Sequence, residues 1–199
     1  METVQKVLIT YSKHGLIRFI GHLDTMSVLL QAMRRAALPL CYSQGFNPHV
    51  KASFSLPLPL GFSSDAEFIE LSLNSSMKTG DIRTAIQEEL PEGLEIKTVE
   101  KIPVMSSSAS GKIESIQYHF NYKGIINDSV QLEENKKRLL GIPGVLNIEL
   151  DGNSGCAFTI ELGRGKEVSP REIAKALLGI DEERIKLIEF TRKNFVFKV

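Results

Sequence analysis

Apolar side chains follow a regular order in the first half of the chain. Residues 6–11 form a strand-like apolar run, and residues 16–20 form a second apolar stretch after a short turn. Residues 22–37 repeat apolar side chains every three or four positions, which predicts an amphipathic helix. The pattern then predicts two strands, a second helix and a last strand, at residues 50–56, 67–73, 80–90 and 94–102. The predicted order is β-α-β-β-α-β.

Local signals mark the ends of the first predicted helix. Gly21 is a plausible N-cap, Asp24 lies in the first turn, and Pro39 follows the helix end. An acid in the first turn and a proline beyond the last turn are typical helix boundaries. We therefore expect the helix to begin at His22.

The second half of the chain repeats the same order. A strand with alternating apolar residues is followed by a helix, a hairpin, a helix that opens with Ser169 as N-cap and Pro170 at its first position, and a final strand. These elements are expected at residues 115–122, 130–140, 145–150 with 156–162, 170–178 and 184–191. Two split βαβ units in a row predict an α+β fold of two tandem ferredoxin-like units with antiparallel sheets.

A serine-rich stretch separates the two halves. Residues 106–111 are small, polar and without periodicity, as is typical of a flexible linker or a long loop. We therefore expect a first domain at residues 1–105 and a second at residues 106–199.

Composition narrows the class of protein. The chain has 199 residues, 42% of them hydrophobic and 24% charged, which is ordinary for a globular protein. It contains no apolar run near the roughly 20 residues that span a bilayer, and its N-terminus has no signal-peptide pattern. We therefore expect a cytoplasmic protein without membrane association.

Cysteine usage and motifs argue against a bound cofactor. Cys41 and Cys156 lie far apart and outside any CxxC pair, so we expect two buried thiols and neither a disulfide nor a zinc site. Residues 163–166 (Gly-Arg-Gly-Lys) do not form a complete phosphate-binding motif and predict a turn. The alternating aromatic residues at 116–122 predict hydrophobic core and no RNA-stacking platform. We expect neither a metal nor another cofactor.

Charge is balanced overall but uneven along the chain. Lysine plus arginine and aspartate plus glutamate each number 24. Residues 13–51 contain five lysine or arginine residues and one carboxylate, and three of the four histidines lie in the same window. A local basic zone on a neutral protein can attract a polyanion.

The loops of this window combine rigid and polar residues. Gly45 permits a positive φ angle, and Pro48 biases Asn47 towards an extended backbone. Residues 56–61 carry two prolines, which lack the N–H that a central strand needs, so this segment is expected to end an edge strand.

Four motifs of the first half occur together and in order. They are R-F-x-x-H-L-D at residues 18–24, the pair Arg34 and Arg35, Y-S-x-G-F-N-P at residues 42–48 and P-L-P-L-G at residues 57–61. In this combination the chain resembles the radical SAM-linked domain family, bacterial proteins of unknown function found beside radical SAM proteins or fused to their C-terminus. The resemblance is dense over residues 11–61. One departure is Gly21, where the family commonly has serine.

The resemblance implies a partner more than an activity. A radical SAM enzyme would hold an iron–sulfur cluster through a CxxxCxxC motif, and two cysteines cannot supply this set. The resemblance therefore implies a non-catalytic accessory that binds RNA or presents a substrate to a radical SAM enzyme, in RNA modification. Tandem ferredoxin-like domains also bind RNA in RAMP-type endoribonucleases, an analogy at the level of fold.

The predicted polyanion site combines cations that neutralise phosphates with aromatic rings that stack on unpaired bases. Its members are Lys13, Arg18, Arg34, Arg35, Tyr42, Ser43, Phe46, Asn47, His49 and Lys51. Two structural interpretations stay open. Arg34 and Arg35 could complement the C-terminal dipole of their helix, and Arg18 could pair with Asp24.

Two other functions remain as alternatives. The proline-rich edge and exposed apolar residues could make the chain a protein-docking module for the same enzyme. His14, His22 and His49 could be the acid and base of a metal-independent ribonuclease. No carboxylate or cysteine lies at metal-ligand spacing beside these histidines.

Overall fold

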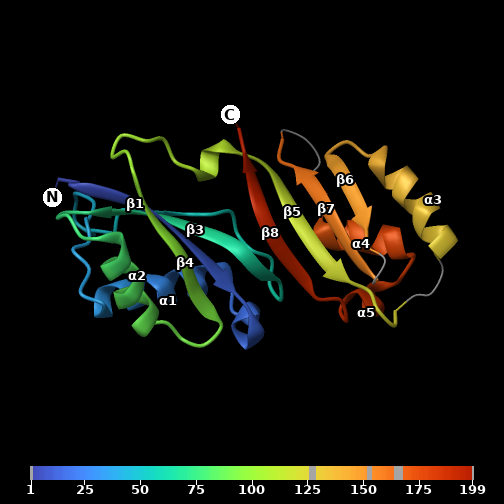
Figure 1. Cartoon of the computed structure of the whole chain (residues 1–199), viewed down its shortest axis with the longest axis horizontal. Coiled ribbons are helices and arrows are strands. Elements are labelled where there is room, and N and C mark those ends of the chain that lie inside the picture. Colours follow the sequence, from blue (N-terminus) through green and yellow to red (C-terminus); the bar gives the residue numbers. More distant parts are fainter. Residues whose placement is uncertain (1, 126–128, 152–153, 164–167, 199) are drawn as a thin grey trace. The chain divides into compact units, whose positions relative to one another are not determined.

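Each half of the chain contains antiparallel strands and helices (Figure 1). The computed structural model describes residues 2–125, 129–151, 154–163 and 168–198. The chain divides into two compact units, Met1–Lys112 and Ile113–Val199. This boundary lies seven residues after the one expected from the serine-rich stretch. The predicted α+β class with antiparallel strand pairing is confirmed.

The first unit contains the helices and strands expected from its apolar pattern. In chain order they are β1 (Gln5–Lys13), the 3-10 helix η1 (Gly15–Phe19), α1 (His22–Arg35), β2 (Ala52–Phe54), β3 (Ser63–Leu73), α2 (Thr79–Glu88), β4 (Leu94–Ile102) and the 3-10 helix η2 (Ser110–Lys112). The strands pair in the order β4-β1-β3-β2, and each pair is antiparallel. The apolar stretch 16–20 is the η1 turn.

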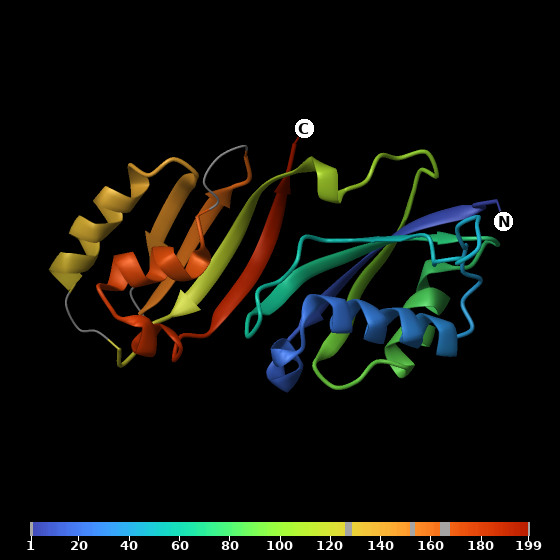
Figure 2. The same ribbon diagram turned by 180° about the vertical axis from the view of Figure 1, so that it is seen from behind.

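The core of the first unit lies between its sheet and α1 and α2, which cover the same face (Figure 2). Alternate residues of β1, among them Val7 and Ile9, point into this core because side chains alternate across a strand. Leu29 of α1 and Ile82 of α2 pack against them. The N-cap of α1 is Gly21, as predicted, and it makes no side-chain capping bond.

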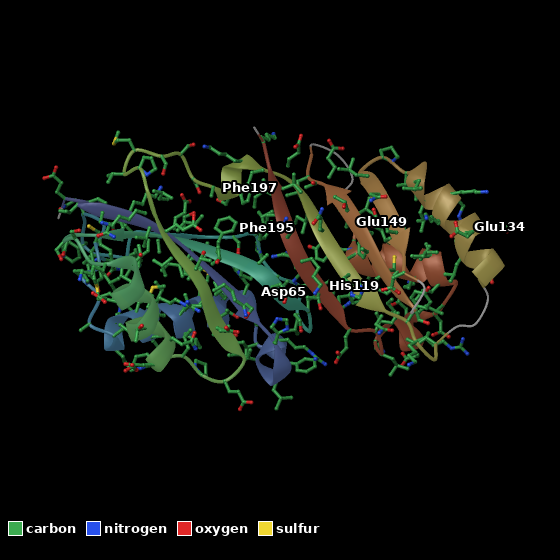
Figure 3. All side chains as sticks on the ribbon, viewed as in Figure 1. Asp65, His119, Glu134, Glu149, Phe195 and Phe197 are labelled. Carbon is green, nitrogen blue, oxygen red and sulfur yellow. The ribbon has the colours of Figure 1, made fainter. Side chains whose placement is uncertain are left out.

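The second unit repeats the arrangement. Its elements are β5 (Ile113–Asn121), α3 (Ser129–Leu140), β6 (Val145–Leu150), β7 (Gly155–Glu161), α4 (Pro170–Leu178), α5 (Glu182–Ile185) and β8 (Phe190–Phe197). The strands pair in the order β8-β5-β7-β6. Tyr118 and Phe120 of β5 are buried against Phe158, which confirms that this alternation is core. His119 and Glu149 lie on the opposite face of the sheet (Figure 3).

The last strand lies later than predicted. Residues 182–185 are helical because the Asp181 side chain accepts hydrogen bonds from the amides of Glu183 and Arg184. The strand follows at Phe190–Phe197 and not at residues 184–191. In α4, Pro170 occupies the first turn as predicted, whereas Ser169 makes no side-chain capping bond.

The serine-rich stretch is not a free linker. Ser106 accepts a hydrogen bond from the Lys6 ammonium through its backbone oxygen, and Ser108 Oγ and the Ala109 amide donate to the carboxylate of Glu70 (2.9 Å each). Glu70 is buried, so its oxygens need such donors. Of the two expected structures, residues 106–109 form the long loop and not the flexible linker, and they belong to the first unit.

Three further predictions concern the cysteines, membrane-spanning helices and two turns. Cys41 and Cys156 are free and buried, as predicted. Among the described residues, no helix combines the length and apolar character needed to cross a bilayer. The predicted turn at residues 163–166 and the tip of the β6–β7 hairpin, residues 152 and 153, fall mainly outside the described residues.

Candidate functional site

Strand register separates the predicted site residues into two groups. At one end of β3, Asp65 Oδ1 lies 2.8 Å from His14 Nε2. Near the other end, the Ser72 amide donates to the backbone oxygen of Lys51, and Ser72 O accepts from the Cys41 amide (3.0 Å each). Seven residues of strand separate Asp65 from Ser72, or about 23 Å at 3.3 Å per residue. The single surface expected from the sequence is therefore not formed.

Lys13 is buried at the first of these ends. Its ammonium donates to the Ile20 carbonyl and to Thr25 Oγ1, both at 2.9 Å. Burial lowers the pKa of Lys13, and the carboxylates of Glu67 and Asp24 act in the opposite direction. Lys13 therefore holds the start of α1 in place and is not available to a polyanion.

The same end brings two motifs together. The Gly61 amide donates to the Arg18 backbone oxygen (3.0 Å), so the P-L-P-L-G loop lies against R-F-x-x-H-L-D. The Arg18 guanidinium carbon lies 4.8 Å from the centroid of the Phe19 ring, a cation–π contact. The two motifs therefore lie in contact at this end of the first unit.

Exposed apolar side chains gather around these motifs. We call Leu16, Phe19, Leu23 and Leu60 the apolar end. Leu16 and Phe19 are three residues apart on η1, which places them on one side of a 3-10 helix, and Leu16 is 87% exposed. Leu23, in the first turn of α1, is 75% exposed. The sequence marks residues 16–20 only as an apolar stretch, and it is the η1 turn that leaves Leu16 and Phe19 exposed.

The other end is built on a short two-stranded ribbon, residues 41–51. The Lys51 amide donates to the Cys41 carbonyl, and the Ser43 amide donates to the His49 carbonyl (2.8 Å each). The His49 amide donates in return to Ser43 Oγ (3.0 Å). Between these bonds Tyr42 pairs with Val50.

Alternation on the ribbon fixes which side chains face outward. Tyr42 and Val50 pack against the core of the first unit. His49 and Lys51 flank Val50 on either side and are exposed. Because neighbouring side chains of an extended strand point to opposite faces, His49 and Lys51 share the outer face.

The tip of the ribbon presents an aromatic ring to solvent. Phe46 is fully exposed (107%), and Asn47 beside it is exposed as well. Gly45 has a φ of +123°, a conformation that L side chains rarely adopt, so a glycine is required at this bend. The predicted members of this end that remain accessible are Phe46, Asn47, His49 and Lys51.

The two arginines of α1 have different surroundings. Both lie in its last turn. Arg35 donates from Nε to Glu89 Oε2 (2.7 Å) and from a terminal nitrogen to the Glu89 carbonyl (2.6 Å), so it ties α1 to the end of α2. Arg34 is exposed. Arg35 therefore has a structural contact other than the predicted one with its own helix dipole, and Arg34 is accessible to a ligand.

The histidines do not form one site. His14 pairs with Asp65, and His22 begins α1 at the same end. His49 lies on the ribbon, which is bonded near the opposite end of β3. Among the described residues, no group of three or more His, Cys, Asp or Glu side chains is placed to hold a metal ion.

Two solved structures show a distant likeness to the chain. An unknown protein from Galdieria sulphuraria is 14% identical, with 98% of this chain and 99% of that chain covered and a TM-score of 0.31. A putative glycine cleavage system transcriptional repressor is 9% identical, with 98% of each chain covered and a TM-score of 0.29. Both TM-scores are too low to support an argument. No curated protein matches the chain.

A family model covers most of the sequence. The model described as "Uncharacterized protein conserved in bacteria (DUF2344)" matches residues 6–150. This match includes the complete first unit apart from its first residues, all four motifs and the start of the second unit. The chain therefore belongs to this family of uncharacterized bacterial proteins.

Proposed function

We propose that this protein is a non-catalytic accessory that binds single-stranded RNA at the 41–51 ribbon and presents it to a radical SAM enzyme. The enzyme partner is implied by the motifs of the first half. The RNA is inferred from the chemistry of the ribbon. Fewer residues are proposed to bind RNA than the sequence suggested, because Lys13 is buried and Arg35 is paired with Glu89.

We further propose that both units are ferredoxin-like. Each has the element order β-α-β-β-α-β, with an added turn of helix, α5, in the second unit. The pairing orders β4-β1-β3-β2 and β8-β5-β7-β6 place each first and third strand side by side at the centre, which is the split βαβ arrangement. In other families this scaffold supports RNA-binding loops, so the fold is compatible with the proposal.

The observation that carries the proposal is Phe46. A fully exposed phenyl ring costs free energy in water, and the hydrogen bonds between Ser43 and His49 hold its loop in one shape. A ring presented in this way can stack on any unpaired base, because every base has a π-face. Lys51 and Arg34 are exposed cations at this end of the unit, and His49 is an exposed polar side chain beside Lys51.

Phe46→Ala tests the stacking contact. Loss of one base–aromatic stack weakens binding by about 1–3 kcal/mol, or roughly 5- to 150-fold in Kd. Fluorescence anisotropy with a labelled single-stranded RNA measures this change. Leu187→Ala removes an exposed apolar side chain of the other unit and is the matched control. Equal affinity of Phe46→Ala and the unaltered protein would contradict the proposal.

Salt dependence tests the phosphate contacts. Two contacts on single-stranded RNA give a slope of about −1.4 in log K against log salt, and loss of one contact reduces the slope by about 0.7. We expect this reduction for Lys51→Ala and no change for Lys101→Ala, an exposed lysine on β4. Salt-independent binding would argue against phosphate recognition.

A protein-docking module is the second candidate, and the apolar end favours it. Four large apolar side chains exposed around two adjoining motifs are typical of a protein-interaction surface. Leu16→Ser with Leu23→Ser should then abolish co-elution with the radical SAM protein of the same organism and leave RNA binding intact. If this double variant co-elutes with the radical SAM protein as the unaltered protein does, docking does not use the apolar end.

The geometry disfavours the third candidate, a ribonuclease using three histidines together. General acid and base must reach the same phosphodiester, and His14 and His49 lie near opposite ends of β3. Incubation of RNA with the protein without metal, across the pH range in which histidine titrates, should leave the RNA intact. Cleavage lost in His14→Ala or His22→Ala would revive this candidate.

A further inference from the structure

One edge of the first sheet carries an unusual set of contacts. β4 stands at the end of the strand order and pairs with β1 on one side. The other side of such a strand presents backbone N–H and C=O groups that can pair with a strand of another molecule. Natural sheets protect such edges because open edges promote association.

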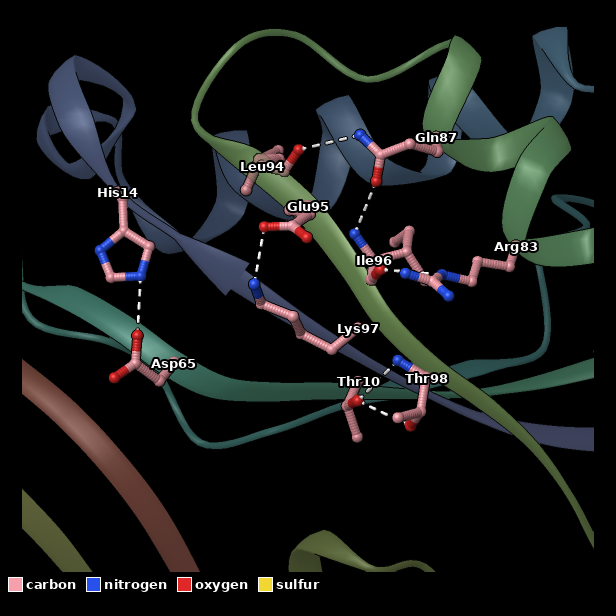
Figure 4. Close-up of polar contacts among 10 residues, drawn as sticks. All are labelled: Thr10, His14, Asp65, Arg83, Gln87, Leu94, Glu95, Ile96, Lys97 and Thr98. Atoms are coloured by element: carbon pink, nitrogen blue, oxygen red, sulfur yellow. Dashed lines mark hydrogen bonds and ion pairs between the residues drawn. The ribbon is translucent and has the colours of Figure 1, made fainter.

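Two side chains of α2 reach these backbone groups (Figure 4). Gln87 Oε1 accepts from the Ile96 amide (2.8 Å), and Gln87 Nε2 donates to the Leu94 carbonyl (3.4 Å). Arg83 Nε donates to the Ile96 carbonyl (3.2 Å). Leu94 and Ile96 are two residues apart, so their backbone groups point to the same side of the strand.

A carboxamide has the same donor and acceptor as a peptide group. Gln87 therefore offers β4 the pair of hydrogen bonds that a neighbouring strand would offer, and Arg83 supplies a further donor. We infer that Gln87 and Arg83 take the place of a neighbouring strand and close the β4 edge against pairing with the β4 edge of a second copy of this chain.

The strand pairing is irregular just beyond these bonds. On the side of β4 that faces β1, the Thr98 amide donates to Thr10 Oγ1 (3.1 Å), and the two threonine hydroxyls lie 2.8 Å apart. The β1–β4 register shifts at this point, between Thr10 and Tyr11. An irregularity of this kind twists an edge strand away from regular pairing.

The exposed side chains of the edge are also charged. Glu95 and Lys97 form an ion pair with an N–O distance of 2.6 Å. Charged side chains on an edge strand oppose the approach of another strand, because pairing would remove them from water. The side-chain bonds, the irregular register and the charges all act on the stretch from Leu94 to Thr98.

The test is the association state of a double variant, Arg83→Met with Gln87→Met. Methionine keeps a long side chain and good helix propensity but cannot bond to the β4 backbone. Sedimentation velocity over a concentration series should show self-association roughly tenfold tighter than that of the unaltered protein. The matched control is Thr84→Met with Glu88→Met, which adds the same apolar atoms to exposed positions of α2 and should not change self-association.

Hydrogen exchange at the Ile96 amide separates this role from a purely structural tether. If the double variant pairs through β4, the Ile96 amide becomes more protected as protein concentration rises. A double variant that keeps the unaltered association state while its Ile96 amide exchanges rapidly at every concentration would overturn the inference. If circular dichroism shows that the double variant is unfolded, the single variant Gln87→Met is measured in the same way.

Discussion

Lys13 and Lys51 show how far burial changes the role of one residue type. Both lie in the motif-bearing segment, and the sequence suggested the same ligand for both. In the structure the Lys13 ammonium bonds to Ile20 and Thr25, while Lys51 lies exposed on the ribbon. Their substitutions should therefore affect different properties.

Lys13→Met should lower the free energy of unfolding by about 2 kcal/mol, because it leaves buried acceptors at Ile20 and Thr25 without their donor. Lys51→Met should change it by less than about 0.5 kcal/mol, as is usual for exposed positions. Urea unfolding measures both. The opposite order is expected for RNA affinity, with the loss confined to Lys51→Met. Equal stability of the two variants would contradict the assigned role of Lys13.

Cys156 should be inert to alkylation in the folded protein. Burial raises the pKa of its thiol to about 12 from an ordinary 9.0, so little reactive thiolate is present near neutral pH. In Cys41→Ser, which leaves one thiol, iodoacetamide should react rapidly only after unfolding. Rapid reaction of the folded protein at about pH 8 would show that the thiol is accessible.

The raised pKa of the Cys156 thiol also determines how its contribution to stability changes with pH. Between pH 9 and pH 12 the folded protein keeps the Cys156 proton, whereas the unfolded chain loses it. The unfolded state then binds fewer protons, so the contribution of Cys156 to stability falls as pH rises through this window. Replacing Cys156 with alanine should remove this contribution. The free energy of unfolding should then fall less steeply between pH 9 and pH 12.

Among the elements, the junction of β1, η1 and β4 depends on one glycine. Gly93 has a φ of +91°, and its carbonyl accepts from the His14 amide at 2.8 Å. A Cβ atom there would lie 2.4 Å from the His14 backbone oxygen and 2.9 Å from Ile17 Cγ2. No flexible side chain can relieve the first of these contacts.

Gly93→Ala should therefore lower the free energy of unfolding by about 2 kcal/mol or more, from the left-handed backbone and the clash together. Gly80→Ala is the matched control. It lies in α2 with open space around it, so alanine should raise stability by about 0.5 kcal/mol. Thermal unfolding followed by circular dichroism compares the two. A Gly93→Ala protein as stable as Gly80→Ala would contradict the close approach.

The elements were predictable where side-chain alternation is strong. β4 at 94–102 and β6 at 145–150 have the predicted bounds, because their apolar residues face one core. The last strand was misplaced because the apolar residues around Ile185 and Ile188 fit either a helical turn or a strand. The cap made by Asp181 decides for the turn.

At the scale of the whole molecule, the position of the boundary between the units depends on Glu70. Its buried carboxylate pairs with Lys6 (3.1 Å) and binds Ser108 and Ala109, which holds the serine-rich stretch on the first unit. The composition of residues 106–111 indicated a linker or a long loop. Nothing in these residues reveals that a buried carboxylate on β3 binds them.

Glu70→Ala should release this stretch and speed tryptic cleavage at Lys112, which is exposed just beyond it. Proteolysis requires a locally mobile chain, and loss of Glu70 removes the acceptors that anchor residues 108 and 109. Mass spectrometry of a limited digest identifies the cut. Glu100→Ala, an exposed acid on β4, should be cleaved at the rate of the unaltered protein. Unchanged cleavage of Glu70→Ala would show that other contacts hold the stretch.

The sequence alone predicts the α+β class, the order of helices and strands apart from η1 and α5, the buried cysteines and the motifs of the family. These follow from local periodicity, turn residues and spacing, which each short segment carries independently. Only the tertiary structure decided which cations remain accessible and where they lie. Strand register sends the two groups of motif residues to opposite ends of β3, and burial and ion pairing then remove Lys13 and Arg35 from the surface available to a ligand. Register and burial depend on contacts between segments far apart in the chain, so no local pattern could reveal them.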